Sequence, residues 1–142
     1  MRKFTFTQLS LIILITACTH SVDKITEKRG HLSTEMVNLS SAVDTYFADL
    51  PVKPTQNDAT ILQIATQHDP SLLAPDFQYY LLKIQYQNPY AVLLLCNKDS
   101  TRAIMEDAGC SARLDRQITD IAPCKFTLRV LRGCQVEGAD PQ

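Results

Sequence analysis

Ala91-Val92-Leu93-Leu94-Leu95-Cys96 is a continuous apolar run in the C-terminal half of the chain. A strand that is covered on both faces has this composition, and so has a short buried helix. The preceding segment favours the strand, because residues 77–86 are rich in aromatic and branched side chains that alternate along one face. Asn88-Pro89 then supplies a turn. The sequence therefore predicts a β-hairpin at the centre of the fold.

Four further segments follow this hairpin. Residues 101–108 contain good helix formers and end at Gly109, which predicts a short helix. Residues 111–121 fit a helix and a strand equally well. Residues 125–131 alternate between apolar and polar side chains and predict a strand with one face in solvent. Residues 138–142 are expected to form a flexible tail.

A helix is predicted before the hairpin, over residues 32–50. Its apolar side chains recur at spacings of three and four, the stripe of an amphipathic helix. Ser33 or Thr34 can cap its N-terminus, and Pro51 ends it. The stripe lasts for fewer than three heptads, which is short for a coiled coil. We therefore expect it to face the core, with a partner-binding helix as the alternative.

The predicted fold class is α+β. A linker with two prolines spans residues 51–57, and Asn57 or Asp58 caps a second helix that ends near residue 67. Two N-terminal helices then precede a three- to four-stranded, mainly antiparallel sheet with helices on one face. We expect one small domain over residues 32–137, held by disulfide bonds.

The chain begins with Arg2 and Lys3, followed by an apolar run from Phe4 to Ala17. This run is shorter than the roughly 20 residues that span a bilayer, and it is typical of a secretory signal peptide. The four residues Ile15-Thr16-Ala17-Cys18 at its end resemble the lipobox of bacterial lipoproteins. The alternatives are a plain signal peptide cut after Ala17 and a short N-terminal anchor.

The resemblance to bacterial lipoproteins implies that residues 1–17 are removed and that Cys18 becomes a lipidated first residue. It implies a diacylglyceryl thioether and, in many bacteria, an acylated amine. The resulting two or three chains give stable anchoring, whereas a single chain binds only marginally. The residue after the cysteine is Thr19 and not aspartate, which in a Gram-negative cell favours the outer membrane, with the domain in the periplasm. Residues 18–31 are expected to be a tether, or past Asp23 the start of the first helix.

Four cysteines remain, an even number that predicts two disulfides in an exported chain: Cys96, Cys110, Cys124 and Cys134. Pairing between sequence neighbours closes the shortest loops and is slightly favoured. A straight strand over residues 125–131 would span about 20 Å and hold Cys124 away from Cys134, so crossed pairing stays open. Metal binding is not expected, because the gaps are wider than zinc sites use.

The composition argues against several functions. Without Arg2 and Lys3 the formal net charge falls from −1 to −3, and no basic run is present, so nucleic-acid binding is not expected. The glycines do not have the spacing of phosphate-binding loops, and no cofactor is expected. His68, the one histidine far from the predicted tether, is expected only to complement a helix end. The adjacent acids Glu106 and Asp107 are expected on a solvated helix face, not in a catalytic pair.

Tyrosines gather around the predicted hairpin at Tyr79, Tyr80, Tyr86 and Tyr90. Strand propensity explains them, but on an uncovered face they would anchor an interface. We expect a non-enzymatic, membrane-anchored lipoprotein that binds another envelope protein. The alternative is a periplasmic inhibitor or ligand-binding module, for example one that blocks a cell-wall hydrolase. An envelope hydrolase is a third hypothesis, for which no nucleophile, base or metal set is visible.

Overall fold

The computed structural model describes residues 7–50 and 55–141, and their side chains from residue 28 onward. Residues 1–6 of the predicted signal peptide, residues 51–54 of the predicted linker and Gln142 lie outside the described residues. The chain divides into two units, Met1–Leu32 and Ser33–Gln142. All elements other than the first part of the first helix belong to the second unit.

Helix α1 spans Thr7–Ala48, so residues 18–31 are helical. Ser33 and Thr34 lie inside this helix, and the prediction that one of them caps its N-terminus is wrong, because helical backbone continues through both. Within residues 7–50 and 55–141, no helix combines the length and apolar character that crossing a membrane requires.

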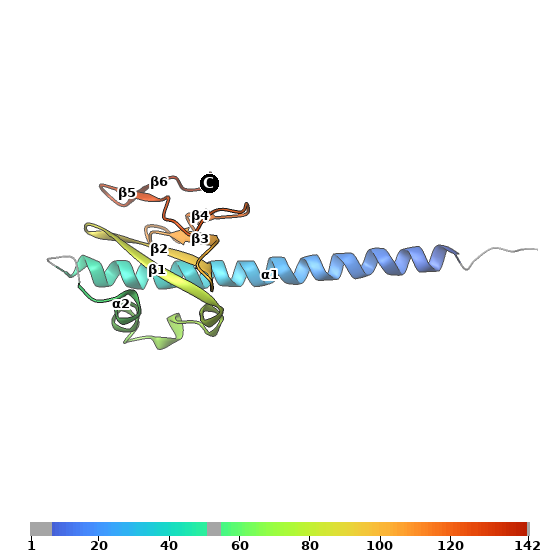
Figure 1. The fold of residues 1–142 in the computed structure, drawn as a ribbon, viewed down its shortest axis with the longest axis horizontal. Helices are drawn as coiled ribbons and strands as arrows, with labels where there is room; N and C mark the ends of the chain where they lie inside the picture. Colours follow the sequence, from blue (N-terminus) through green and yellow to red (C-terminus); the bar gives the residue numbers. More distant parts are fainter. Residues whose placement is uncertain (1–6, 51–54, 142) are drawn as a thin grey trace, which may run out of the picture. The chain divides into compact units, whose positions relative to one another are not determined.

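The second unit is built from short elements around two antiparallel sheets, which confirms the predicted α+β class (Figure 1). Strands β1 to β4 form one sheet in the order β1-β2-β3-β4, and β5 and β6 form a separate hairpin. The elements after α1 are α2 (Asp58–Ala65), η1 (Pro70–Leu72), η2 (Pro75–Tyr79), β1 (Tyr80–Gln87), β2 (Tyr90–Asn97), β3 (Ala103–Asp107), β4 (Arg116–Gln117), β5 (Arg129–Leu131) and β6 (Gln135–Glu137).

The predicted hairpin is confirmed as β1 and β2, joined at Asn88-Pro89. Strand β2 lies between β1 and β3, and residues 91–96 are at most 1% exposed. This burial on both faces is the reason for the uninterrupted apolar run. The first three residues of the segment predicted as one strand, 77–79, belong instead to the 3-10 helix η2.

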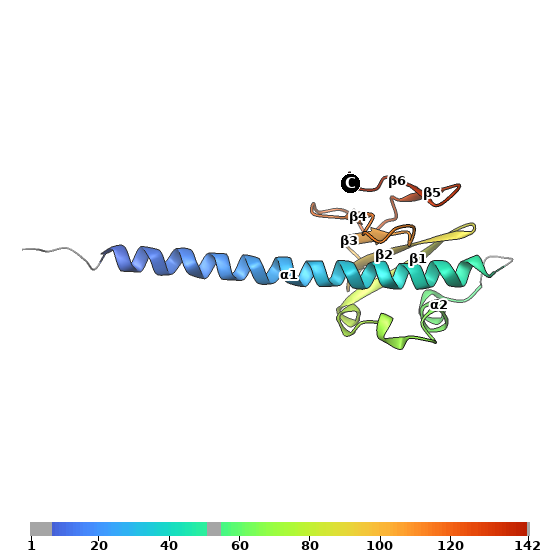
Figure 2. The ribbon, with the colours of Figure 1, turned by 180° about the vertical axis from the view of Figure 1, so that it is seen from behind.

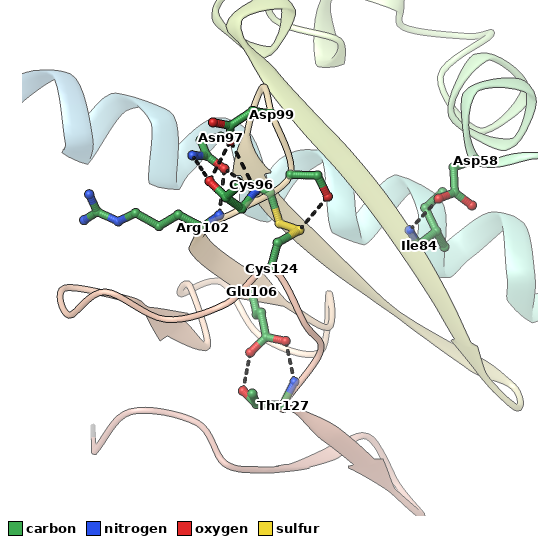
Figure 3. The surroundings of a disulfide bond; sticks show 11 residues. Asp58, Ile84, Cys96, Asn97, Asp99, Arg102, Glu106, Cys124 and Thr127 are labelled. Atoms are coloured by element: carbon green, nitrogen blue, oxygen red, sulfur yellow. Dashed lines mark hydrogen bonds between the residues drawn. A yellow bond between two sulfur atoms is a disulfide. The ribbon is translucent and has the colours of Figure 1, made fainter.

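Residues 103–107 form strand β3, so the helix predicted over residues 101–108 is wrong. Side chains in the preceding turn explain the difference: Asn97 Oδ1 accepts the backbone N–H of Thr101 at 3.0 Å and of Arg102 at 2.7 Å (Figure 3). These bonds reverse the chain, so that the next residues pair with β2. Sheet pairing and burial override helix propensity here. In the ambiguous segment 111–121, only Arg116–Gln117 pairs as a strand.

The two faces of the sheet are covered by different parts of the chain. Residues 33–48 of α1 lie on one face (Figures 1 and 2), and the α1 side chains Met36, Leu39 and Val43 are fully buried. The other face of β2 packs against the segment after β4, through buried Leu128 and half-buried Phe126. The predicted stripe of α1 is thus a core face.

Two disulfides join this second layer to the sheet. Cys96 at the end of β2 is bonded to Cys124, and Cys110 is bonded to Cys134 in the β5–β6 turn. The favoured neighbour pairing is wrong, and the crossed pairing is the one observed. The predicted strand 125–131 pairs only from Arg129, and it turns back at once into β6. Cys134 therefore lies away from Cys124 and against the segment that follows β3.

Candidate functional site

Two separate hollows lie beside the edge strand β1, where α2 and η2 contact this strand. The first, of about 440 Å³, is mainly apolar, and Leu62, Leu73, Phe77, Tyr80 and Leu82 are among the residues that line it. The second, of about 670 Å³, is more polar, and Phe47, Asp58, Ile61, Ile84 and Tyr86 are among its lining residues. We call these two hollows together the α2–β1 groove.

The N-terminus of α2 fixes the middle of the groove. The side chain of Asn57 accepts the backbone N–H of Thr60 at 3.0 Å, which confirms one of the two predicted caps. The side chain of Asp58 faces β1 instead, and its Oδ2 accepts the N–H of Ile84 at 3.2 Å (Figure 3). This bond occupies an outward N–H of the edge strand, so a partner strand cannot pair with β1 at this point. A partner chain that approaches β1 at Ile84 is therefore limited to side-chain contacts there.

The first hollow is shaped by two prolines that begin 3-10 turns. Pro70 starts η1, where Asp69 caps the turn by accepting the N–H of Ser71 at 3.1 Å. Pro75 starts η2, which carries the buried ring of Phe77 into the core. The cap at Asp69 holds the first turn, and the buried ring of Phe77 holds the second. The apolar wall between them is thus supported by local hydrogen bonds and packing.

The four predicted tyrosines do not form one cluster. Tyr80 and Tyr86 both line the groove, but they lie at opposite ends of β1, about 20 Å apart at the rise of a strand. Tyr86 is committed to structure: its ring centroid lies 5.1 Å from that of Phe47, and its hydroxyl donates to Asn88 Oδ1. Tyr79 is 63% exposed. Tyr90 lines another cavity, beside the β5–β6 turn.

Sequence reasoning did not find the groove itself. It placed α2 and the first strand correctly as separate elements, but the contact between Asp58 and Ile84 joins residues 26 positions apart. A repeating pattern of apolar residues does not predict a contact between such distant residues. Asp58 is an acidic residue in the first turn of a helix, but the helix dipole favours such a residue without any tertiary partner.

Glu106 and Asp107 are buried, at 0% and 1% exposure, and the expectation of a solvated helix face is wrong. Neighbours on a strand point to opposite faces, so the two carboxyl groups enter different layers. Glu106 accepts the N–H of Thr127 at 2.7 Å and the hydroxyl of the same residue (Figure 3). Arg116 Nη1 lies 3.9 Å from Glu106 Oε2. Glu106 thus holds the outer layer to the sheet.

Asp107 points toward α1 and, in its ionised form, accepts three hydrogen bonds. The donors are the N–H of Asp115 at 2.9 Å, the N–H of Gly109 at 3.1 Å and the hydroxyl of Ser40. Burial raises the pKa of Asp107 to about 6, and the nearby carboxylate of Asp115 adds to the increase against the effect of these bonds. Neither Glu106 nor Asp107 is open to solvent, and each carboxyl group is bonded to neighbouring parts of the chain.

His68 makes no hydrogen bond to an acidic side chain among the residues that the structure describes. His68 is exposed, and its Nε2 lies 3.2 Å from Nε2 of Gln67, a neutral neighbour in the chain. His68 lines neither hollow of the groove. His31 is also exposed, and the side chains of His20 and Cys18 lie outside the described ones. Lipidation of Cys18 stays a prediction.

Comparison of the chain with models of known protein families gave no match. Comparisons with curated proteins and with solved structures also gave no match.

Proposed function

We propose that the chain is a bacterial envelope lipoprotein, anchored in the outer membrane through Cys18, whose second unit binds another envelope protein. The anchor is supported by the sequence Ile15-Thr16-Ala17-Cys18 after a basic start and an apolar run. Two disulfides in the second unit are compatible with an oxidising compartment such as the periplasm. The role is non-enzymatic, with neither a metal nor a cofactor.

The α2–β1 groove is the observation that carries the interaction role. Its first hollow is apolar, open to one side and large enough for a bulky side chain. Interfaces commonly gain most of their affinity from a few such anchors in well-formed pockets. Because Asp58 blocks strand pairing at Ile84, the partner contributes an apolar anchor side chain and not an added strand.

Because the domain is anchored to the membrane, a weak contact is sufficient to bind a partner at the same surface. A lipidated domain is confined to the membrane surface, so its effective concentration toward partners at that surface is high. One or two anchor side chains in the groove then hold the complex, although the same contact in solution would be weak. The tether and the groove thus act together in this proposal.

The β5–β6 turn supports the second candidate function, an inhibitor of an envelope enzyme such as a cell-wall hydrolase. Residues 132–134 form a turn at the surface that the Cys110–Cys134 disulfide holds in place. Leu131 beside it is 43% exposed. A rigid, exposed loop of this kind suits insertion into an active site, because its conformation is fixed before binding.

Two matched substitutions separate these functions. Ala59→Glu places a charge on an exposed residue that lines the first hollow, and Leu131→Glu places the same charge beside the β5–β6 turn. Both positions are exposed, so both variants should keep the melting temperature of the wild type. The measurement is cross-linked affinity capture from intact envelopes, with a soluble, secreted form as the control.

We expect Ala59→Glu to reduce capture of a membrane-complex subunit by about 30-fold, the loss that removing a hot-spot contact causes. Leu131→Glu should leave that capture unchanged. If Leu131→Glu alone abolishes capture, and the captured protein is a wall-degrading enzyme bound equally by the soluble form, the inhibitor role replaces the assembly role. Equal capture by both variants and the wild type would contradict both sites.

Cys18→Ala tests the anchor. The thioether requires the cysteine sulfur, so the variant should lose lipid and should leave the outer-membrane fraction. The measurement is membrane fractionation together with the intact mass of the product. Thr19→Ser is the matched control, because it changes the neighbouring residue without removing the sulfur and should keep the wild-type distribution. Recovery of a mature, membrane-bound Cys18→Ala product would contradict lipidation.

A further inference from the structure

A hydrogen-bonded row of three oxygens joins α1 to the end of β3. Ser40 Oγ lies 3.0 Å from the carbonyl oxygen of Val37 and also within hydrogen-bonding distance of Asp107 Oδ2. A serine hydroxyl carries one hydrogen and can donate it to one acceptor at a time. An ionised Asp107 supplies no hydrogen of its own. Both contacts of Ser40 are therefore made together only when Asp107 carries a proton.

The surroundings of Asp107 favour that proton. Ser40 is 1% exposed and Asp115 is 5% exposed, so the row lies in a dry part of the second unit. Asp115 belongs to the same loop as Gly109, and its Oδ2 accepts the N–H of Ala108 at 2.8 Å. The carboxyl groups of Asp107 and Asp115 thus lie in one buried region, and their negative charges repel each other.

The other charged groups near Asp107 are occupied elsewhere. On α1, Asp44 lies one turn beyond Ser40 and accepts the N–H of Ala91 at 3.2 Å. On β3, Glu106 points to the opposite face, where Arg116 on β4 is its partner. From the C-terminal segment, the carboxylate of Asp140 accepts the N–H of Gln117 at 2.8 Å. Asp115 is the group whose charge acts on Asp107.

We propose that a proton on Asp107 Oδ2 keeps the loop 108–115 closed over Asp107, beside residues 33–48 of α1. The acid takes this proton from solvent and keeps it on Oδ2, where it forms a hydrogen bond to Ser40 Oγ. The hydroxyl of Ser40 then forms a hydrogen bond to the carbonyl oxygen of Val37. Above the titration range the proton returns to solvent, and Ser40 turns its hydrogen to the carboxylate and loses its bond to Val37 within α1. The closed loop then buries a negative charge beside Asp115, which favours opening. The contact is a pH-sensitive switch within the fold.

The direction of the pH effect follows from linkage. Burial raises the pKa of Asp107 from 3.8 to about 6, so the folded chain binds this proton more tightly than the unfolded chain does. The resulting stabilisation is fully present below pH 3.8 and is lost as the pH rises through about 6. Between about pH 5 and pH 7, opening of the loop should become about tenfold easier, because one pKa unit corresponds to a factor of ten.

The test is carboxyl NMR of the full chain, with assignment of Asp107, together with amide hydrogen exchange of residues 108–115. We expect Asp107 to titrate near pH 6, and the protection factors of the loop to fall about tenfold from about pH 5 to pH 7. Asp107→Asn resembles the protonated acid in shape and hydrogen-bond donors, and in it the protection factors should stay constant over this range.

Two further variants keep the test informative if Asp107→Asn does not fold. Asp115→Asn keeps an oxygen acceptor for Ala108 but removes the charge, so it should lower the titration midpoint of Asp107. Asp44→Asn changes a half-buried acid on the same helix as Ser40 and should leave that midpoint where it is. A wild-type midpoint near 3.8, or loop protection that is independent of pH in the wild type, would overturn the proposal.

Discussion

Reduction of both disulfides is expected to lower the free energy of unfolding by about 4–8 kcal/mol, at about 2–4 kcal/mol for each bridge. The bonds close loops between residues separated by 28 and 24 positions, and such loops restrict the unfolded chain strongly. A domain of this size has a total stability of only about 5–15 kcal/mol. The reduced chain should therefore be close to unfolding at room temperature.

Reduction should have a large effect on stability because the two disulfides attach an irregular layer to the sheet. The layer that covers the outer face of β2 contains little regular structure apart from the hairpin of β5 and β6, each three residues long. Its packing depends on Leu128 and a few half-buried neighbours. Cys96–Cys124 ties the beginning of this layer to β2, and Cys110–Cys134 ties its end to the loop after β3.

Denaturant unfolding with and without a reductant measures the effect, and a thiol count confirms that reduction is complete. Three variants, each with two cysteines replaced by serine, test which cysteines are paired. Cys96→Ser with Cys124→Ser should cost about 2–4 kcal/mol, and so should Cys110→Ser with Cys134→Ser. Cys96→Ser with Cys110→Ser breaks both bridges and should cost as much as full reduction. Three equal losses would contradict the crossed pairing.

Local patterns predicted the parts of the fold whose partners are close in sequence. The hairpin follows from an apolar run, an alternating strand and a two-residue turn, all within residues 80–97. Helix α2 follows from its cap, because Asn57 bonds only three residues ahead. In each case the interaction that decides the structure lies inside the window that a sequence pattern covers.

Interactions between distant residues explain the predictions that were wrong. Residues 103–107 are good helix formers, yet they form β3, because β2 has a second edge to pair and the turn at Asn97 directs the chain onto it. The burial of Glu106 depends on Thr127, 21 positions later. The crossed disulfides depend on where the outer layer lies on the sheet. Helix propensity, charge and cysteine spacing contain none of this information.

Gly109→Ala is expected to lower the free energy of unfolding by about 2–5 kcal/mol, the sum of two costs. Gly109 has a φ of +68°, in the left-handed region, where a side chain costs about 1–2 kcal/mol. A Cβ atom here would also lie 2.8 Å from the carbonyl oxygen and 2.9 Å from the carbonyl carbon of Ser40. These are backbone atoms of α1, so the helix itself must move away from the loop, at a cost of about 1–3 kcal/mol.

Gly133→Ala is the matched control, because Gly133 has a similar φ of +73° but no atom within 4 Å of an added Cβ. Its free energy of unfolding should fall only by the cost of placing a side chain in the left-handed region, about 1–2 kcal/mol. Gly109→Asn separates the two costs at one site: asparagine tolerates the left-handed conformation but still brings a Cβ against Ser40. Denaturant unfolding of the oxidised chains measures all three. If Gly109→Ala and Gly133→Ala lose the same amount, or if Gly109→Asn restores wild-type stability, the close contact between this loop and α1 is wrong. The larger loss at Gly109 would show that helix and loop meet through backbone, which is the geometry that brings Ser40 to Asp107.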